Sequence, residues 1–354
     1  MTRYVLRRLL QAIPTLIGIS IISFILVNST PGDPIAVRYF DPNITEETKA
    51  ILRRQLGLDQ PLYLQYLNWF AGISLRRGDV VEEFAVGQTT CTYLAWLDTT
   101  LCDTQGGILR GNLGTSLSTK QPVWDRLLER MPATLELGLA ALLVSLLVGV
   151  PLGVLSAVYQ GSWFDNTVRV LAVVGNALPA FWFALMLIFL FGVVLGWLPT
   201  GGRQTVSLEM RFDPVDRLQH LILPTVILAL GPIATYSRFM RTETLEVIRT
   251  DYVRTAKAKG LSPFSVWFVH ALRNAMIPLL TILGPAITGL LSGAVVTETV
   301  FAWPGMGRLT LNAAFQRDYP MVLGAVMFFS ALTILGNLLS DIFYGIVDPR
   351  VRLS

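Results

Sequence analysis

Charged residues are scarce in this sequence. They make up 15% of the 354 residues, whereas an ordinary soluble domain carries about 25%. The mean hydropathy is +0.55, and the uncharged runs are close to or longer than the roughly 20 residues that a helix needs to cross a bilayer core. This scarcity excludes an ordinary soluble fold and predicts an integral membrane protein.

Short catalytic motifs are also missing. The sequence contains no phosphate-binding loop ending in Gly-Lys-Ser/Thr, no His-Glu-x-x-His and no Gly-x-Ser-x-Gly. Its two histidines, His220 and His270, are too few for a His-rich metal site. We therefore expect no enzyme activity and no metal or cofactor bound by this chain.

Cysteine is limited to two residues, Cys91 and Cys102. Both lie in the long polar segment 30–133, where we expect a small folded structure on the outer side of the membrane. In an oxidising compartment, a bond between them would close a loop of about ten residues and contribute on the order of 2 to 3 kcal/mol. A disulfide is the favoured interpretation, and two free thiols are the alternative.

Six uncharged windows predict about six spanning helices. Glycine and proline near the ends of these windows, such as Gly161 and Pro199, are expected to mark turns at the membrane surface. The sequence "PGDP" at Pro31–Pro34 similarly predicts a rigid turn after the first window, with direct contact to the solute as the alternative. The windows are Leu9–Gly32, Leu137–Phe164, Val170–Gly202, Leu218–Ser237, Asn274–Thr297 and Tyr319–Ser340.

Acidic residues occur only at the ends of these windows. Glu136, Glu298 and Asp341 are therefore expected at helix termini within reach of water. Since charges deep in a span usually mark proton or ion pathways, their absence argues against a proton-coupled carrier.

Lysine and arginine in the short loops favour an amino terminus on the inside of the membrane. The run that follows Arg3, Arg7 and Arg8 is too long for a signal peptide. The net charge of +4 fits a basic cytoplasmic face held near anionic headgroups, and needs no nucleic acid to explain it.

The loop 238–273 carries the most unusual sequence. Within "RTDYVRTAKAKGLSPFSVWFVHALRNAMIP", residues Asp251–Lys259 favour a helix, and Gly260 and Pro263 break it before an amphipathic run resumes. A helix, a turn and a second helix would form a basic knob. Such a knob could dock in a groove on another protein or lie on anionic headgroups.

This stretch resembles the cytoplasmic "EAA" loop of ATP-binding-cassette importers, in the form found in dipeptide, oligopeptide and nickel permeases. The resemblance continues through "YVLRRLLQAIPTLIGISIISFILVNSTPGDP", "GNLGTSLSTKQPVWDRLLERMPATLELGLAA" and "TETVFAWPGMGRLTLNAAFQRDYPMVLGA", and so covers nearly the whole chain. It implies that the ATPase-coupling residues are Arg254, Thr255, Ala256, Lys257, Ala258, Lys259, Gly260, Leu261, Ser262 and Pro263.

Two departures from the family pattern are visible. Arg254, Thr255 and Ala256 stand where the general loop begins Glu-Ala-Ala. The segment from about 72 to 107, which holds both cysteines, resembles an insertion. The insertion puts in doubt whether the family's contacts on the outer side of the membrane apply to this chain. In the coupling loop, a charge placed at Ala256 or Gly260 is expected to uncouple ATP hydrolysis from uptake.

The resemblance implies an all-α polytopic membrane protein with the type I importer permease fold. Residues 1–29 would form the cytoplasmic amino terminus and first span, 30–133 an extracytoplasmic loop, 134–347 the permease core, and 348–354 a cytoplasmic tail. The implied location is the inner membrane of a bacterium. The implied partners are a second homologous permease, giving a heterodimer, two cytoplasmic ATPases that bind ATP and Mg²⁺, and an extracytoplasmic solute-binding protein.

The implied function is to form half of a pathway for di- or oligopeptides. Nickel or another small solute is the alternative within the family. From other classes, a self-contained channel or secondary carrier predicts transport by this chain alone, and a membrane enzyme or assembly factor predicts turnover without an ATPase.

Overall fold

The computed structural model describes residues 2–29, 59–77, 90–103, 106–205, 213–276, 278–279, 282–283, 286, 289 and 294–347. The predicted turn at Pro31–Pro34 and the tail 348–354 lie outside these residues. The chain divides into two compact units. Unit 1 comprises Met1–Val5, Arg130–Leu309 and Leu332–Ser354, and unit 2 comprises Leu6–Glu129 and Thr310–Ala331.

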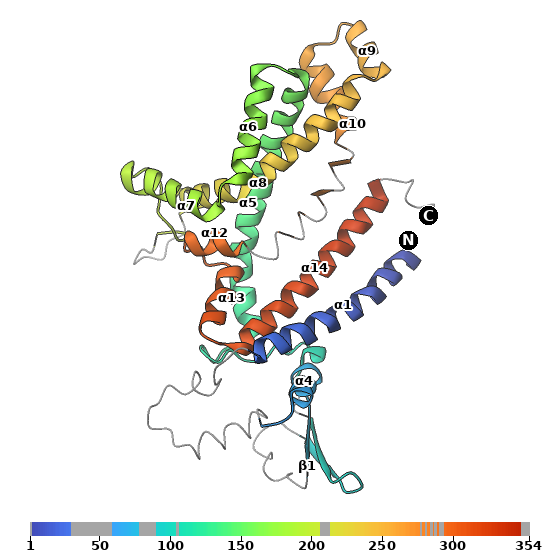
Figure 1. The fold of residues 1–354 in the computed structure, drawn as a ribbon, viewed down its shortest axis with the longest axis vertical. Helices are drawn as coiled ribbons and strands as arrows, with labels where there is room; N and C mark the ends of the chain where they lie inside the picture. The colour runs from blue at the N-terminus through green and yellow to red at the C-terminus, as the bar shows by residue number, and fades with distance from the viewer. Residues whose placement is uncertain are drawn as a thin grey trace. The chain divides into compact units, whose positions relative to one another are not determined.

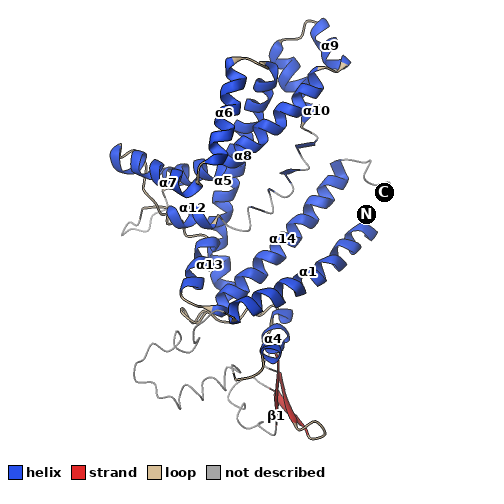
Figure 2. Cartoon of the chain, viewed as in Figure 1, coloured by secondary structure: helices blue, strands red, loops and turns tan. Residues whose placement is uncertain are grey.

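Helices dominate the described chain (Figures 1 and 2). The longer ones are α1 (Thr2–Asn28), α5 (Val123–Val158), α6 (Trp163–Ala177), α8 (Pro214–Ile248) and α14 (Tyr319–Val347). The shorter ones are α4 (Leu62–Ala71), η2 (Ile108–Arg110), α7 (Ala180–Leu187), the π-helical η3 (Ile188–Val194), α9 (Asp251–Ala258), the π-helical η4 (Ser265–Ala271), α10 (Leu272–Ala275), α12 (Val295–Val300) and α13 (Met306–Phe315).

Within the described residues, four helices are long and apolar enough to cross a membrane, namely α1, α5, α8 and α14. The predicted window Val170–Gly202 instead breaks in two, because α6 and the α7–η3 helix meet at a bend of 103°. Pro179 precedes α7 and has no N–H to continue α6, and Leu178 is already extended. Most of the predicted window Asn274–Thr297 lies outside the described residues.

The helices α5 and α8 of unit 1 pack closely. A Cβ added at Gly149 would lie 3.1 Å from the Ile233 carbonyl oxygen, and one at Gly153 would lie 2.5 Å from the Ser237 carbonyl oxygen. Glycines four residues apart allow two membrane helices to approach in this way. Next to this contact lies a core cluster formed by Val150, Val154, Tyr236, Met240, Ala275 and Leu279.

A small sheet in unit 2 occupies the segment that the sequence marked as an insertion. It contains β1 (Ile73–Arg77), β2 (Thr90–Leu94) and β3 (Thr99–Asp103) in the antiparallel order β1-β3-β2. Cys91 and Cys102 are directly opposite, with Cα atoms 4.1 Å apart, and form a disulfide. The predicted disulfide is therefore confirmed, and this part of an otherwise helical chain is a braced hairpin.

The first turn of α14 is fixed within unit 2 by a buried carboxylate. Asp318 accepts hydrogen bonds from the hydroxyls of Ser116 and Ser118 and from the backbone N–H of Leu117. Asp318 also precedes the first residue of α14 and receives the Met321 N–H, so it caps the helix.

Candidate functional site

The predicted coupling segment folds as a helix, a turn and a second helix. α9 ends at Ala258, and Gly260 adopts a φ of 74°, a left-handed conformation that favours glycine. Ser262 accepts a hydrogen bond from the Ser265 N–H, and η4 begins at Ser265. The structure predicted from Gly260 and Pro263 is thus the one observed.

The inner face of this segment is a hydrophobic cluster. Val253 and Ala256 of α9 are buried against Val266 and Ala271 of η4. The Lys257 ammonium lies 4.5 Å from the centre of the Trp267 ring, which adds a cation–π contact between the two helices. These contacts make α9 and η4 a single packed element.

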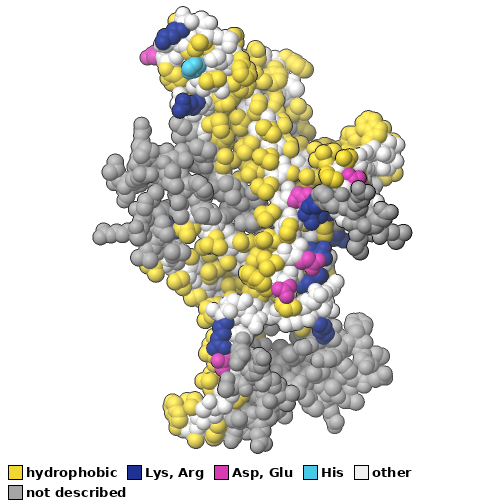
Figure 3. Space-filling view, turned by 180° about the vertical axis from the view of Figure 1, so that it is seen from behind, with side chains coloured by type: hydrophobic (Ala, Val, Ile, Leu, Met, Phe, Trp, Pro, Cys, Tyr) yellow, Lys and Arg dark blue, Asp and Glu magenta, His cyan; other side chains and the backbone are white. Residues whose placement is uncertain are grey.

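The outer face of the segment is basic and partly apolar. Of the ten predicted coupling residues, nine are exposed and Ala256 is buried with 6% of its surface accessible. Phe264, which follows the ten coupling residues, is 70% exposed and stacks on Phe268. In Figure 3, basic and histidine side chains reach the surface at the α9 end, whereas apolar side chains cover the helices next to it.

The burial of Ala256 changes what a charge placed at this position would do. A charge at this position would be placed between α9 and η4, where it would disrupt packing before it could affect docking. Leu261 and Phe264 are the better probes, because both side chains are exposed.

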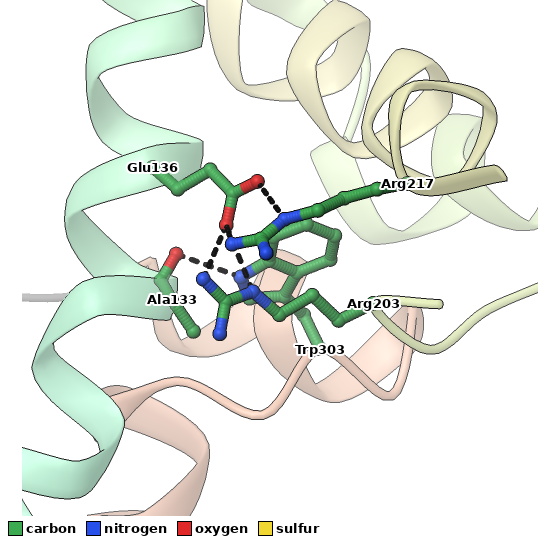
Figure 4. Close-up of polar contacts among 5 residues, drawn as sticks. All are labelled: Ala133, Glu136, Arg203, Arg217 and Trp303. Carbon is green, nitrogen blue, oxygen red and sulfur yellow. Dashed lines mark hydrogen bonds and ion pairs between the residues drawn. The ribbon is translucent and has the colours of Figure 1, made fainter. Parts of the chain in front are cut away.

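A second polar centre lies on α5 (Figure 4). Arg203 donates to Glu136 Oε2 from Nε at 2.8 Å and from Nη2 at 2.5 Å. Arg217 donates from Nε to Oε1 and from Nη2 to Oε2, both at 2.6 Å. Glu136 is 21% exposed, so it joins α5 to α8 and to the segment before α8, and is not simply a solvated helix terminus.

Glu298 is fully buried, which contradicts the expectation that water reaches it. Its Oε1 accepts the Thr134 hydroxyl at 2.9 Å, and its Oε2 accepts the Arg308 N–H at 2.8 Å. The chain folds back after α12, so that Gly305 contacts the carboxylate closely enough that an added Cβ would collide with it. The side chain of Asp341 lies outside the described residues.

The same fold-back buries a tryptophan. Trp303 has no accessible surface and donates from its indole N–H to the Ala133 carbonyl oxygen at 2.8 Å. Met306 N–H donates to the Thr134 hydroxyl oxygen at 2.8 Å. Residues 301–308 are therefore held against α5 at the level of Thr134.

A cavity of about 210 Å³ lies beside this contact, between α5 and α8. No charged side chain lines it; the described lining residues are Thr134, Gly138, Ala141, Leu142, Ser145, Leu228, Pro232, Tyr236, Ala286, Gly289 and Ala294. Among the described residues, no group of His, Cys, Asp or Glu could hold a metal ion.

Sequence reasoning did not find the centres at Glu136 and Glu298. Except for Arg308, which is ten residues from Glu298, their partners are far away in the chain. A charge near the end of a hydrophobic window also gives no sign of burial. The only local signal was the pair of glycines in "WPGMG", since Gly305 and Gly307 both pack against Glu298.

Helices long and apolar enough to cross a membrane, with a packed basic element beside them, fit a membrane transport component. The family profile described as "Binding-protein-dependent transport system inner membrane component" matches residues 149–353. A second profile, for the amino-terminal part of the same membrane component, matches residues 1–138. The chain belongs to this family of importer permeases, which confirms the family predicted from the sequence.

Several curated relatives match over their full length. The chain is 39% identical to the "Di/tripeptide transport system permease protein DppB" of Pseudomonas aeruginosa (strain UCBPP-PA14), covering 99% of both chains. It is 38% identical to the "Oligopeptide transport system permease protein AppB" of Bacillus subtilis (strain 168), covering 99% of this chain and all of the relative. It is 39% identical to the "Dipeptide transport system permease protein DppB" of Escherichia coli (strain K12), again over 99% of both.

A solved structure was also found by fold comparison. It is an inward-facing MetNI methionine ABC transporter, with a TM-score of 0.47 and 18% identity over 63% of this chain and 96% of that one. The family assignment and the apolar helices together establish a multi-pass membrane permease.

Proposed function

We propose that this permease forms half of a pathway for di- or oligopeptides in the inner membrane of a bacterium. The names of its full-length relatives, all peptide permeases, are the observation that carries the proposal. The other half of the pathway is a second homologous permease, and an extracytoplasmic solute-binding protein delivers the peptide. Two cytoplasmic ATPases bind ATP and Mg²⁺, and this chain performs no catalysis.

The division of the chain predicted from the sequence belongs to the same proposal. Residues 1–29 form the cytoplasmic amino terminus and the first span, 30–133 the outer loop with its insertion at about 72–107, and 134–347 the core. The amino terminus and the tail 348–354 are cytoplasmic. The basic outer face of α9 agrees with an inside location, because short inside loops carry an excess of lysine and arginine.

The outer face of α9 and the turn after it form the proposed ATPase-docking surface. It presents Arg254, Lys257 and Lys259 for electrostatic steering, and Leu261 and Phe264 as exposed apolar anchors. The hydrophobic cluster beneath this surface transmits a displacement of α9 to η4, because the two helices cannot separate without exposing Val253 and Ala256.

The cavity between α5 and α8 is the part of this chain that we assign to the pathway. Its small side chains leave room, and Tyr236 provides a hydroxyl. A lining without charges cannot select one amino-acid side chain over another by ion pairing, but it can accommodate the peptide backbone that all substrates share. Selection of the solute would then fall to the binding protein.

The docking assignment is tested in the assembled complex with Leu261→Asp and Phe264→Ala. Loss of one exposed anchor should weaken ATPase binding by about 1–2 kcal/mol, a factor of roughly 5 to 30. Co-purification of the ATPases and ATP-dependent uptake of a labelled dipeptide into liposomes are the two measurements. The matched control is Phe315→Ala, which removes a phenylalanine that is 79% exposed in unit 2.

The docking surface and the peptide assignment are tested by different outcomes of these measurements. Normal ATPase binding and uptake by both variants would overturn the docking surface. Active ATPases that bind the unmodified complex, without uptake of any di- or oligopeptide, would overturn the peptide assignment while leaving the docking surface in place.

A further inference from the structure

A buried ion pair joins α6 to α8 in unit 1. Asp165 lies in the first turn of α6 and is 1% exposed. Arg241 of α8 donates to its two carboxylate oxygens, from Nε at 2.7 Å and from Nη2 at 2.8 Å. This two-pronged geometry fixes both the distance and the orientation of the two helices.

The same carboxylate also binds α5 and the turn that follows it. The Ser156 hydroxyl donates to Oδ1 at 2.5 Å, and the Gly161 N–H donates to Oδ2 at 3.0 Å. The Asp165 N–H donates to the hydroxyl of Ser162, the cap of α6. Each carboxylate oxygen thus accepts two hydrogen bonds, and one side chain holds three helices together.

The packing of α5, α6 and α8 leaves a groove between them. An apolar groove of about 760 Å³ lies among α5, α6, α7 and α8, with Phe164, Thr167, Leu171, Ile227 and Leu230 among its lining residues. The close contact of Gly149 and Gly153 with α8 holds α5 in place. α6 packs along α8 and buries Val168 and Ala172, and the Asp165–Arg241 pair adds a directional polar contact to this packing.

The helix that carries Arg241 leads directly to α9. α8 ends at Ile248 and α9 begins at Asp251. Val247 and Trp267 pack both on the core cluster that contains Met240 and on the cluster beneath α9. A displacement applied to α9 and η4 therefore reaches α8 first, and the ion pair is the polar link from α8 to α6.

We propose that Asp165 and Arg241 are positioning residues that make α5, α6 and α8 move with α9 and η4 as one rigid body during ATP-driven closure. This inference rests on the proposed docking of α9 on the ATPases. Rigid-body rotation of packed elements transmits a displacement at one end to the other. If α6 could slide on α8, part of the displacement would be lost between these two helices and would not reach α6.

A distance measurement tests the rigid body. Spin labels are placed on cysteines at Val170 of α6 and Val269 of η4, which are 60% and 52% exposed and lie outside the ten predicted coupling residues. Both native cysteines are in the disulfide and do not take a label. In the unmodified complex, the distance between the labels should be the same before and after ATP binding.

The test variant is Arg241→Lys. Lysine keeps the positive charge near Asp165, but an ammonium cannot reproduce the paired hydrogen bonds of the guanidinium. We expect a broader distance distribution that shifts when ATP binds, and a severalfold rise in ATP hydrolysed per dipeptide transported. The matched control is Arg126→Lys, in the more exposed ion pair of Arg126 with Glu129, which should leave both readouts unchanged.

A distance that changes with ATP in the unmodified complex would overturn the inference, and so would an Arg241→Lys complex that matches the unmodified one in distance and in hydrolysis per dipeptide. If Arg241→Lys fails to assemble, Ser156→Ala removes one hydrogen bond and keeps the ion pair, and should give a smaller shift in the same direction. The distance between the spin labels is measured with ATP and without solute, so this test remains decisive even if the transported solute is not a peptide.

Discussion

At the scale of single residues, buried carboxylates with defined partners organise unit 1. Glu298 has one hydrogen-bond donor on each oxygen, Thr134 and the Arg308 N–H. An amide in its place would present one oxygen and one NH₂ group. If the amide oxygen accepted the Arg308 N–H, the NH₂ group would face Thr134, and the Thr134 O–H would lose the acceptor that it has in Glu298.

We therefore expect Glu298→Gln to lower the free energy of unfolding by about 1–3 kcal/mol, the penalty for a buried polar group left unpaired. Denaturant unfolding of the purified subunit in detergent, followed by tryptophan fluorescence, measures the change. Glu129→Gln is the control, because Glu129 is 54% exposed. Equal midpoints for the two variants would show that the Glu298 contacts do not stabilise the fold.

At the scale of elements, we expect the disulfide to brace the sheet of unit 2. Its three strands are five residues each, and the Cys91–Cys102 bond links β2 to β3 covalently. Reduction of Cys91–Cys102 should destabilise the hairpin by about 2–3 kcal/mol. When the hairpin must open before a protease can cut it, this loss of stability makes proteolysis of residues 90–103 roughly 30- to 150-fold faster.

Proteolysis with and without reductant measures this effect. A chain carrying Cys91→Ser and Cys102→Ser should be cleaved at the fast rate in both conditions, which separates loss of the bond from other effects of the reductant. A reductant-insensitive rate in the unmodified chain would mean that the strands hold without the bond.

Elements differ in how far the sequence predicts them. The helix-turn-helix around Gly260 was predicted because glycine and proline act locally on the backbone. The break between α6 and α7 was missed, although Pro179 lies at it, because hydrophobic composition is the same on both sides and a window average does not report a bend. The start of α5 at Val123, before the predicted core boundary at 134, was missed because charged residues such as Asp125 and Glu129 end the uncharged window and not the helix.

At the scale of the whole molecule, the sequence predicted the class of protein but not the contacts that organise it. The long uncharged runs and the segments that resemble importer permeases predicted a helical permease, and the family match confirms this class. The pairs Asp165–Arg241 and Glu136–Arg217 join residues that are distant in sequence. Neither residue of such a pair has a local pattern that names its partner, so only the folded chain reveals them.

The orientation of the chain in the membrane leads to the last prediction. If the α9 end faces the cytoplasm, a cysteine at Ser262 should react with a membrane-impermeant maleimide in inverted vesicles and not in right-side-out cells. A cysteine at Trp96, which is 79% exposed at the tip of the outer hairpin, should show the opposite behaviour. The unmodified chain is the control, because both of its cysteines are bonded and should not react. Labelling of Ser262→Cys from outside would place α9 out of reach of any cytoplasmic ATPase, since the basic loop would then lie on the wrong side of the membrane.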